Sequence, residues 1–369
     1  MKAAILEPDS AVLTVEDIPV PTPGPGEVLV KVHACGVCHT DLHVIKGEIN
    51  FPRPGVLGHE ISGTVAEVGP GVEGLEPGTS VVSSFIMPCG RCRRCARGED
   101  ELCLPFFEMN RKQGVLYDGT TRLHRADGSD LAMYSMGGLA EYSVVPATDV
   151  FAVPPETPLS DAAIIGCSLF TAFGATHNVA ALELGQSVAV VAVGGVGLNV
   201  VQLAHLSGAH PIVAVDVADD KLEAAQQLGA THLVNSRSVD PREEVTRITG
   251  GRGVDVAFEV LGRTETVELA VGLLGEGGRA VLVGIPPLKT TASLELTDFV
   301  RRKLSVQGSY GARTRSDMPT LVELVTAGSV QLQGVVSRRY PIDEAPQAYQ
   351  DLDAGGIVGR AVVEMPAAG

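Results

Sequence analysis

The 369-residue chain is short of positive charge, with 28 lysines and arginines against 44 aspartates and glutamates and a formal net charge of −16. A surface with this balance repels a polyphosphate backbone, so nucleic acid is not an expected partner. We expect no signal peptide, because the AAIL run of residues 3–6 is too short for its apolar region. We therefore expect a cytoplasmic protein whose thiols stay reduced.

Long apolar runs are scarce as well. Residues 187–204, SVAVVAVGGVGLNVVQLA, are about long enough to span a bilayer. The run nevertheless holds three glycines and two amides, and it lies between charged amphipathic segments. It predicts a buried strand followed by a helix, with no membrane span.

Length and composition indicate a folded chain of two domains, since 45% of residues are hydrophobic and 20% are charged. Short valine-rich runs between Pro and Gly residues predict an antiparallel β-rich domain at the N-terminus. Further along, strands and helices alternate, which is typical of a doubly wound parallel sheet in an α/β domain. The six strands are expected at 188–193, 212–216, 232–235, 254–260, 279–285 and 304–309, and the domains at 1–168, 169–309 and, returning to the first domain, 310–369.

Four cysteines lie close together in CGRCRRCARGEDELC, which spans residues 89–103. Two, two and seven residues separate Cys89, Cys92, Cys95 and Cys103. This spacing suits one tetrahedral zinc ion with four thiolates and no open position, so the predicted role is structural. An iron–sulfur cluster or a nucleic-acid-binding knuckle are the alternatives. The acidic residues at 99–101 and the net charge disfavour the knuckle.

A second set of possible metal ligands is Cys38, His59 and Cys167. Each is weak evidence alone, because a single cysteine is usually a small core residue. Cys35 and Cys38 also form a C-x-x-C pair, but no thioredoxin-like βαβ pattern surrounds it.

The order of several motifs carries a resemblance that covers essentially the whole chain. These motifs are GVCHTDLH at 36–43, GHE at 58–60, the four-cysteine segment, GC at 166–167 before TAFG, GGVGLNVV at 194–201 followed by VD, FEVLGR at 258–263, VLVGIPP at 281–287 and IVGRAVV at 357–363. The chain resembles the zinc-containing medium-chain alcohol dehydrogenases. The resemblance implies a GroES-like β-rich catalytic domain that is split around a Rossmann domain with a six-stranded parallel sheet.

The resemblance assigns chemistry to the second ligand set. It implies that Cys38, His59 and Cys167 bind a catalytic zinc ion, which gives two zinc ions per chain. Such a site keeps a fourth position for water or substrate and lowers the pKa of a bound alcohol. Asp41 and Glu60 resemble the family's outer carboxylates. The resemblance implies that Thr40 passes the alcohol proton, through the ribose hydroxyl of NAD, to His43, and both residue types suit that transfer.

The cofactor prediction rests on a glycine-rich turn between a strand and a helix. Gly194, Gly195 and Gly197 allow the backbone to approach a pyrophosphate at the helix N-terminus, although Ala192 stands where the family has its first glycine. Asp216 ends the next strand and suits a ribose diol, which favours NAD over NADP; a helix N-cap is its alternative role. The resemblance and the surrounding sequence add the remaining cofactor-site residues, which are His39, Thr171, Val196, Lys221, Arg263, Val283, Ile285 and Arg360.

The sequence does not name the alcohol. An apolar substrate of moderate size is expected, because the residues predicted to line the pocket are Phe85, Met133, Tyr134, Ile285 and Tyr310. The segment at 110–128 resembles a loop of thiol-dependent formaldehyde dehydrogenases. Their carboxylate-binding arginine is not in register here, and Arg111 lies nearby. A non-catalytic zinc and nucleotide binder is the third alternative. The expected assembly is a homodimer or homotetramer.

Overall fold

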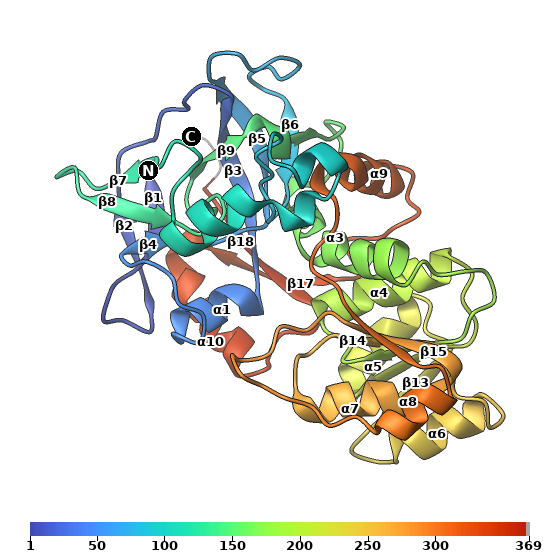
Figure 1. The fold of residues 1–369 in the computed structure, drawn as a ribbon. Helices are drawn as coiled ribbons and strands as arrows, with labels where there is room; N and C mark the ends of the chain where they lie inside the picture. The colour runs from blue at the N-terminus through green and yellow to red at the C-terminus, as the bar shows by residue number, and fades with distance from the viewer. Residues whose placement is uncertain (367–369) are drawn as a thin grey trace. The chain divides into compact units, whose positions relative to one another are not determined.

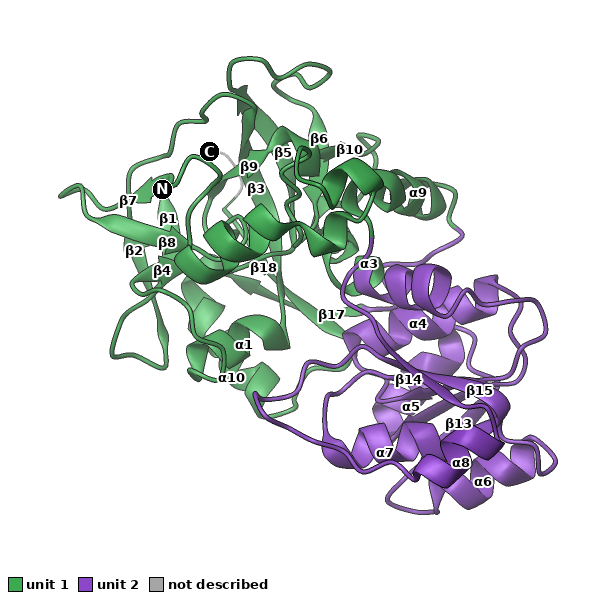
Figure 2. Cartoon of the chain, viewed as in Figure 1, with its two compact units in different colours: residues 1–170, 313–328, 336–369 green, residues 171–312, 329–335 purple. Residues whose placement is uncertain are grey.

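The computed structural model describes residues 1–366, so the last three residues of the predicted 310–369 segment lie outside it. The described chain divides into two compact units, which Figure 2 colours separately. Unit 1 contains residues 1–170, 313–328 and 336–366, and unit 2 contains residues 171–312 and 329–335.

Unit 1 is built on two sheets. One has the strand order β2-β1-β4-β8-β7, and the other has the order β10-β6-β5-β3-β18-β17, with β9 also paired to β3. The strands are β1 Lys2–Leu6, β2 Leu13–Asp17, β3 Glu27–Val37, β4 Gly55–Val56, β5 Ile61–Val68, β6 Ser80–Ser83, β7 Leu123–His124, β8 Asp130–Met133, β9 Tyr142–Pro146, β10 Phe151–Ala152, β17 Val336–Pro341 and β18 Arg360–Glu364.

Strand β3 is the centre of unit 1. Its sequence EVLVKVHACGV is buried at nearly every position, because β5, β9 and β18 all pair with it in antiparallel fashion. The helical segments of this unit are mostly short: α1 His39–Ile45, η1 Cys95–Arg97, η2 Asp100–Leu102, the π-helix η3 Phe106–Arg111, η4 Ala147–Asp149, α2 Leu159–Ala162, η5 Ala163–Gly166, α9 Thr314–Thr326, η7 Ile342–Glu344 and α10 Ala345–Asp353. Helix α3 Ser168–Phe173 runs from unit 1 into unit 2.

Unit 2 is the predicted parallel sheet, and the order β13-β12-β11-β14-β15-β16 confirms the doubly wound fold. Its strands are β11 Val188–Val191, β12 Ile212–Asp216, β13 His232–Asn235, β14 Val254–Glu259, β15 Leu274–Leu282 and β16 Ser305–Gly308. Its helices are η6 Gly174–Val179, α4 Gly195–Leu206, α5 Asp219–Gln227, α6 Pro241–Ile248, α7 Thr264–Gly272 and α8 Leu296–Arg301. Figure 1 shows these helices around the strands.

The core of unit 2 forms where helices cover the sheet. Helices α4 and α7 contact β11, and α5 contacts β12 and β13. Strand β11 is buried at all four positions, as a parallel strand between two helical layers should be. Strand β15 begins at Leu274 rather than at residue 279, because a register shift lets Leu274 pair with Val254 ahead of the regular ladder.

The apolar run at 187–204 forms β11 and most of α4, as predicted. No single helix among residues 1–366 is both long enough and apolar enough to cross a membrane. One bent pair of helical segments, Leu159–Gly166 with Ser168–Val179, is long and apolar enough when the two are taken together. Buried helices of a protein core have the same length and composition.

Candidate active site

The structure brings the three predicted catalytic ligands together in unit 1. Cys38 stands between β3 and α1, His59 between β4 and β5, and Cys167 between η5 and α3. With Glu60, their ligand atoms lie within 4.8 Å of one another, and all four residues are buried. His59 Nε2 is 3.5 Å from Cys167 Sγ. Two sulfurs and an imidazole nitrogen at this spacing fit a zinc ion.

The electrostatics of this cluster favour a cation. A hydrogen bond with Cys167 and the positive charges of Arg360 and His59 lower the pKa of Cys38 well below its usual value, although burial opposes this. Burial also opposes a charged His59, but Asp41 and Cys38 raise the pKa of His59 to about 10. The negative groups that favour a proton on this ring would equally favour a metal ion at Nε2.

Asp41 holds His59 in the orientation that a metal ligand needs. Its Oδ1 is 3.0 Å from His59 Nδ1 and accepts the Gly58 N–H at 3.2 Å. Nδ1 is therefore occupied, and Nε2 faces the thiols. The Tyr349 hydroxyl, from α10, donates to Asp41 Oδ2 at 3.0 Å. Tyr349 could not be identified from the sequence, because it lies 308 positions from Asp41 and no local pattern marks it.

Glu60 is not an exposed carboxylate; it is fully buried beside the ligands. Neither of its oxygens accepts a hydrogen bond from a described residue, but Arg360 Nη2 lies 3.3 Å from Oε1. Burial raises the pKa of Glu60 to about 7, although Arg360 opposes the shift. A Cβ at Gly36 would lie 2.5 Å from the Glu60 carboxyl carbon, so a side chain there would displace this carboxyl group. Glu60 can thus serve as an outer carboxylate or as a fourth protein ligand.

Arg360 lies in the same cluster rather than on the surface. It is 5% exposed, and its Nη2 is 3.7 Å from Cys167 Sγ. The neighbouring anions Cys38 and Glu60 raise its pKa despite burial. The predicted contact with a cofactor pyrophosphate stays a prediction.

The predicted proton relay lies on helix α1. Thr40 Oγ1 is 3.6 Å from Cys38 Sγ, next to the ligand cluster. His43 follows one helical turn later and is partly exposed, so the two side chains share a face of α1. His43 Nδ1 pairs with Glu48, a partner that the sequence did not predict. His39, the first residue of α1, is exposed.

The four-cysteine segment folds around one point, with its four sulfurs within 4.8 Å of one another. Backbone N–H groups support the thiols: Cys92 N donates to Cys89 Sγ at 3.3 Å, and Cys89 N donates to Cys103 Sγ at 3.2 Å. All seven cysteines are free of disulfides. Four sulfurs so placed fit a closed tetrahedral zinc site.

An arginine from α9 anchors this cysteine segment. Asp100 is 1% exposed, and Arg315 Nη2 donates to its Oδ1 at 2.8 Å. The same guanidinium also donates to the backbone carbonyl of Cys95. The segment is therefore tied to a helix far along the chain, and spacing alone could not have revealed this.

Aromatic rings surround His59. Its ring centre lies 6.0 Å from those of Phe85 and Tyr134, both in edge-to-face geometry. We call these two rings and the rings that pack on them the aromatic cluster, which contains Phe51, Phe85, Tyr134 and Phe170. Phe85, Tyr134 and Met133 were predicted to line the substrate pocket, and all three are buried. The other two predicted lining residues, Ile285 and Tyr310, belong to unit 2.

Unit 2 holds the predicted cofactor turn, which links β11 to α4. Ala192 adopts a left-handed φ of 72°, as the glycine it replaces would do without strain. A Cβ at Gly197 would lie 2.2 Å from the Ala192 carbonyl oxygen, so this position requires glycine. Gly194 is the N-cap of α4. The other residues of unit 2 that were predicted to contact the cofactor are Thr171, Gly195, Val196, Lys221, Arg263 and Val283.

Asp216 supports the same turn. Its Oδ2 accepts the Val193 N–H at 2.9 Å, and its Oδ1 accepts those of Val217 and Ala218. It is not the N-cap of α5, because Ala218 takes that position. A carboxylate beside the turn, on the neighbouring strand, is where a ribose diol would meet it.

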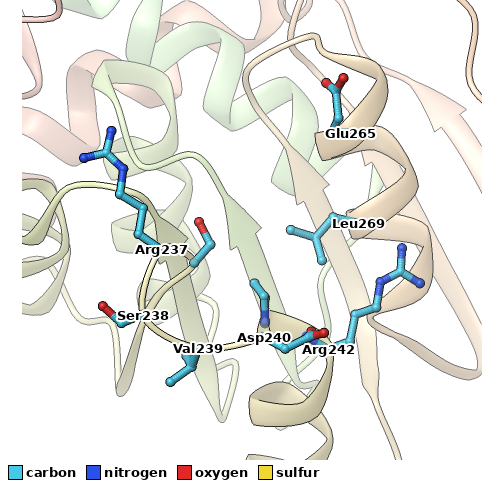
Figure 3. A pocket seen from close by; sticks show the side chains of 9 residues that line it. Arg237, Ser238, Val239, Asp240, Arg242, Glu265 and Leu269 are labelled. Atoms are coloured by element: carbon cyan, nitrogen blue, oxygen red, sulfur yellow. The ribbon is translucent and has the colours of Figure 1, made fainter.

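An open groove lies elsewhere in unit 2. Its volume is about 540 Å³, and it is lined by residues 236–242 together with Glu265 and Leu269 of α7, as Figure 3 shows. None of the predicted site residues lines it. Arg242, on one wall, already donates to the Glu268 carbonyl. The ligand cluster, rather than this groove, carries the chemistry.

Comparison with known proteins identifies the family. Residues 24–155 match the alcohol dehydrogenase GroES-like domain, and residues 195–327 match the zinc-binding dehydrogenase family. The chain is 34% identical to an NDMA-dependent alcohol dehydrogenase of Amycolatopsis methanolica, over 96% of each chain. It is 33% identical to the S-(hydroxymethyl)glutathione dehydrogenase of Saccharomyces cerevisiae, over 93% of this chain and 91% of the relative.

A solved structure agrees with these relatives. The benzyl alcohol dehydrogenase of Acinetobacter calcoaceticus superposes with a TM-score of 0.92, at 32% identity and over 99% of each chain. The predicted family and fold are confirmed, and the chain's activity class is that of a zinc-dependent alcohol dehydrogenase with a nicotinamide cofactor. This chain therefore belongs to the zinc-containing medium-chain alcohol dehydrogenases.

Proposed function

We propose that the chain oxidises a small-to-medium apolar primary or secondary alcohol to an aldehyde or ketone, and catalyses the reverse reaction, with NAD as the hydride acceptor. The observation that carries this proposal is the buried cluster of Cys38, His59 and Cys167 with Thr40 beside it. A zinc ion held there would supply Lewis-acid chemistry, which lowers the pKa of an alcohol at the fourth position.

The chain's own residues then have defined tasks. Asp41 fixes the ring of His59, so that Nε2 is the nitrogen presented to the metal. The Thr40 hydroxyl can accept the alcohol proton and donate its own toward solvent. His43, at the partly exposed end of the same helix face, would receive that proton. The aromatic cluster limits water around His59, which strengthens each of these interactions.

The proposed cofactor is NAD rather than NADP, and Asp216 is the reason. A carboxylate beside the turn favours a ribose diol and repels an additional phosphate. Replacing Asp216 with Gly should raise the relative use of NADP, although it also removes acceptors for three N–H groups and should lower stability. Wild-type kinetics with equal or better use of NADP would refute this choice.

A panel of alcohols tests the activity directly. Zinc-loaded protein would be assayed by NADH absorbance with primary and secondary alcohols, with and without glutathione or another thiol. Turnover of free alcohols supports the proposal. Activity only on formaldehyde with an added thiol would favour the second candidate, a thiol-dependent formaldehyde dehydrogenase, which the yeast relative supports. Cofactor binding without any turnover would indicate the non-catalytic alternative.

We also propose a cytoplasmic homodimer or homotetramer that acts on a small-molecule alcohol or aldehyde. The seven free cysteines are consistent with a reducing compartment. Light scattering coupled to size-exclusion chromatography measures the assembly, and a monomer at micromolar concentration would contradict it.

A further inference from the structure

A buried amide, that of Asn110, holds the backbone that carries Tyr134. Asn110 belongs to the π-helix η3, and its side chain is fully buried. Its Nδ2 donates to the carbonyl oxygen of Met133 at 3.2 Å and to that of Ser135 at 2.8 Å. One amide group therefore fixes the chain on both sides of Tyr134.

The backbone at Ser135 requires such support. Ser135 has a left-handed φ of 54°, which a residue other than glycine adopts only with strain. Strained residues persist where the surrounding structure holds them firmly. The Ser135 hydroxyl is buried and donates to the carbonyl oxygen of Phe85 at 2.9 Å. The contact from Asn110 and the contact to Phe85 thus hold one strained residue from two sides.

These contacts act on the two rings beside the predicted metal ligand His59. The ring centres of Tyr134 and Phe85 each lie 6.0 Å from that of His59, within unit 1. Asn110 holds the backbone of Tyr134 directly, and it holds that of Phe85 through Ser135. Both rings are therefore fixed relative to the imidazole.

The amide oxygen of Asn110 indicates that the residue contributes geometry more than stability. Oδ1 is buried and accepts no hydrogen bond from a described residue. A buried acceptor without a partner costs about as much free energy as two ordinary hydrogen bonds contribute. The two bonds from Nδ2 and the unpaired Oδ1 therefore nearly offset each other. What remains is the direction that the amide imposes on two carbonyl groups.

We infer that Asn110 is a positioning residue for the alcohol pocket. By fixing Tyr134 and Phe85, it makes the site favour alcohols broad enough to contact both rings over small alcohols. This inference rests on the proposed function, because it takes these two rings as the wall of the pocket that receives the alcohol. Asn110 acts through the rings and has no part in the hydride or proton transfer.

A broad and a small alcohol test this preference. The measured quantity is the ratio of kcat/KM for benzyl alcohol to that for ethanol, in zinc-loaded protein at saturating NAD. The ratio should exceed one in the wild type, and Asn110→Leu should lower it about 10-fold, the scale on which apolar pockets discriminate. The fall should lie mainly in the KM for benzyl alcohol, because a wall contacts the ground state and the transition state alike. A wild-type ratio below one, or a fall in kcat alone, would overturn the inference.

Thr121→Val is the matched control. The Thr121 hydroxyl is also buried and donates to a carbonyl oxygen of strand β8, that of Leu131, at 2.6 Å. Valine keeps the shape and removes this hydrogen bond, but Leu131 does not adjoin Tyr134. The ratio should stay at its wild-type value. An equal fall in Thr121→Val and Asn110→Leu would show that any loosening of β8 alters the ratio, and the inference would be wrong.

Ser135→Ala provides the second variant. It removes only the hydroxyl that donates to Phe85, so it should lower the ratio in the same direction by a smaller factor. Thermal melting shows whether each variant is folded. If folded Asn110→Leu keeps the wild-type ratio, the inference fails. If Asn110→Leu does not fold, an unchanged ratio in Ser135→Ala overturns it.

The activity of the wild type separates this inference from the proposed function. Oxidation of either alcohol by the zinc-loaded wild type supports the proposed function, whatever the variants do to the ratio. If the wild type oxidises neither of these two alcohols nor any other in the panel, the proposed function itself fails.

Discussion

Individual residues determine how the ligand cluster is held, and Asp41 is the clearest case. One buried carboxylate accepts the Gly58 N–H, contacts His59 Nδ1 and accepts the hydroxyl of Tyr349. The first two contacts come from the neighbouring loop, but the third comes from α10. Helix α10 supplies no predicted metal ligand, but its Tyr349 supports Asp41, which orients the ligand His59.

Tyr349→Phe should weaken zinc binding at the Cys38 cluster. The variant removes one hydrogen bond from Asp41 and leaves the ring in place, and outer-sphere changes of this kind cost about 10- to 100-fold in metal affinity. Competition with a chelator measures the affinity, and the visible spectrum of cobalt-substituted protein reports the ligand geometry. Tyr340→Phe is the control, because that hydroxyl donates to Asp351 instead. Equal zinc retention in the two variants would show that Tyr349 only fills space.

Thr40→Ala should greatly slow alcohol oxidation and leave NAD affinity nearly unchanged. Losing one relay hydroxyl should cost on the order of 100-fold or more, the usual scale of general acid–base assistance. Thr40→Ser keeps the hydroxyl and should retain most activity. His43→Gln should be milder, because water or buffer can replace a partly exposed group. Steady-state kinetics check this ranking, and near wild-type oxidation by Thr40→Ala would mean that the proton leaves by another route.

Secondary-structure elements show which parts of the fold the sequence could predict. The parallel strands of unit 2 were found from their short apolar runs, and the cysteine segment from its spacing. Local patterns sufficed for these because the information lies within a few neighbouring residues. Contacts such as Arg315 with Asp100 or Tyr349 with Asp41 join residues 215 and 308 positions apart. Nothing in either local sequence marks them.

Arg111 illustrates the same limit within a single element. The sequence shows that Arg111 belongs to the segment at 110–128. It does not show that the guanidinium lies over the rings of Phe85, Phe106 and Tyr134. Its position depends on the π-helical turn η3, whose residues Phe106–Arg111 carry no distinctive local pattern. At the end of this turn the Arg111 guanidinium contacts the rings of Phe85 and Tyr134, which the local sequence does not indicate.

The turn between β11 and α4 allows a test at the scale of an element. Gly194→Ala should cost little stability beyond the loss of a favourable N-cap residue, because a Cβ there meets nothing within 4 Å. It should nevertheless weaken NAD binding if the backbone of this turn approaches the pyrophosphate. Gly197→Ala should lose both stability and NAD binding, because its Cβ would lie 2.2 Å from the Ala192 carbonyl oxygen. Thermal melting and titration of NADH fluorescence measure the two properties. Unchanged NAD affinity in Gly194→Ala would place the pyrophosphate elsewhere.

At the scale of the whole molecule, the two functions of a dehydrogenase are assigned to different units. Both ligand clusters are built from residues of unit 1, whereas the turn and Asp216 belong to unit 2. Substitutions at the ligand clusters of unit 1 should therefore change the metal content, and substitutions at the turn or Asp216 of unit 2 should change cofactor binding. Elemental analysis of fresh, chelator-free protein should give two zinc ions per chain.

The two zinc ions should be separable by their effects. Cys92→Ser opens a site with four protein ligands, and structural zinc sites contribute directly to folding, so melting of unit 1 should shift to a lower temperature. Cys38→Ser should abolish turnover with little loss of stability, because the cluster stays buried in a sheet-supported region of unit 1. Both variants should still bind NADH through unit 2. If Cys92→Ser melted like wild type but lost turnover, the two sites would have exchanged roles, and the spacing of the four cysteines would no longer argue for a structural zinc.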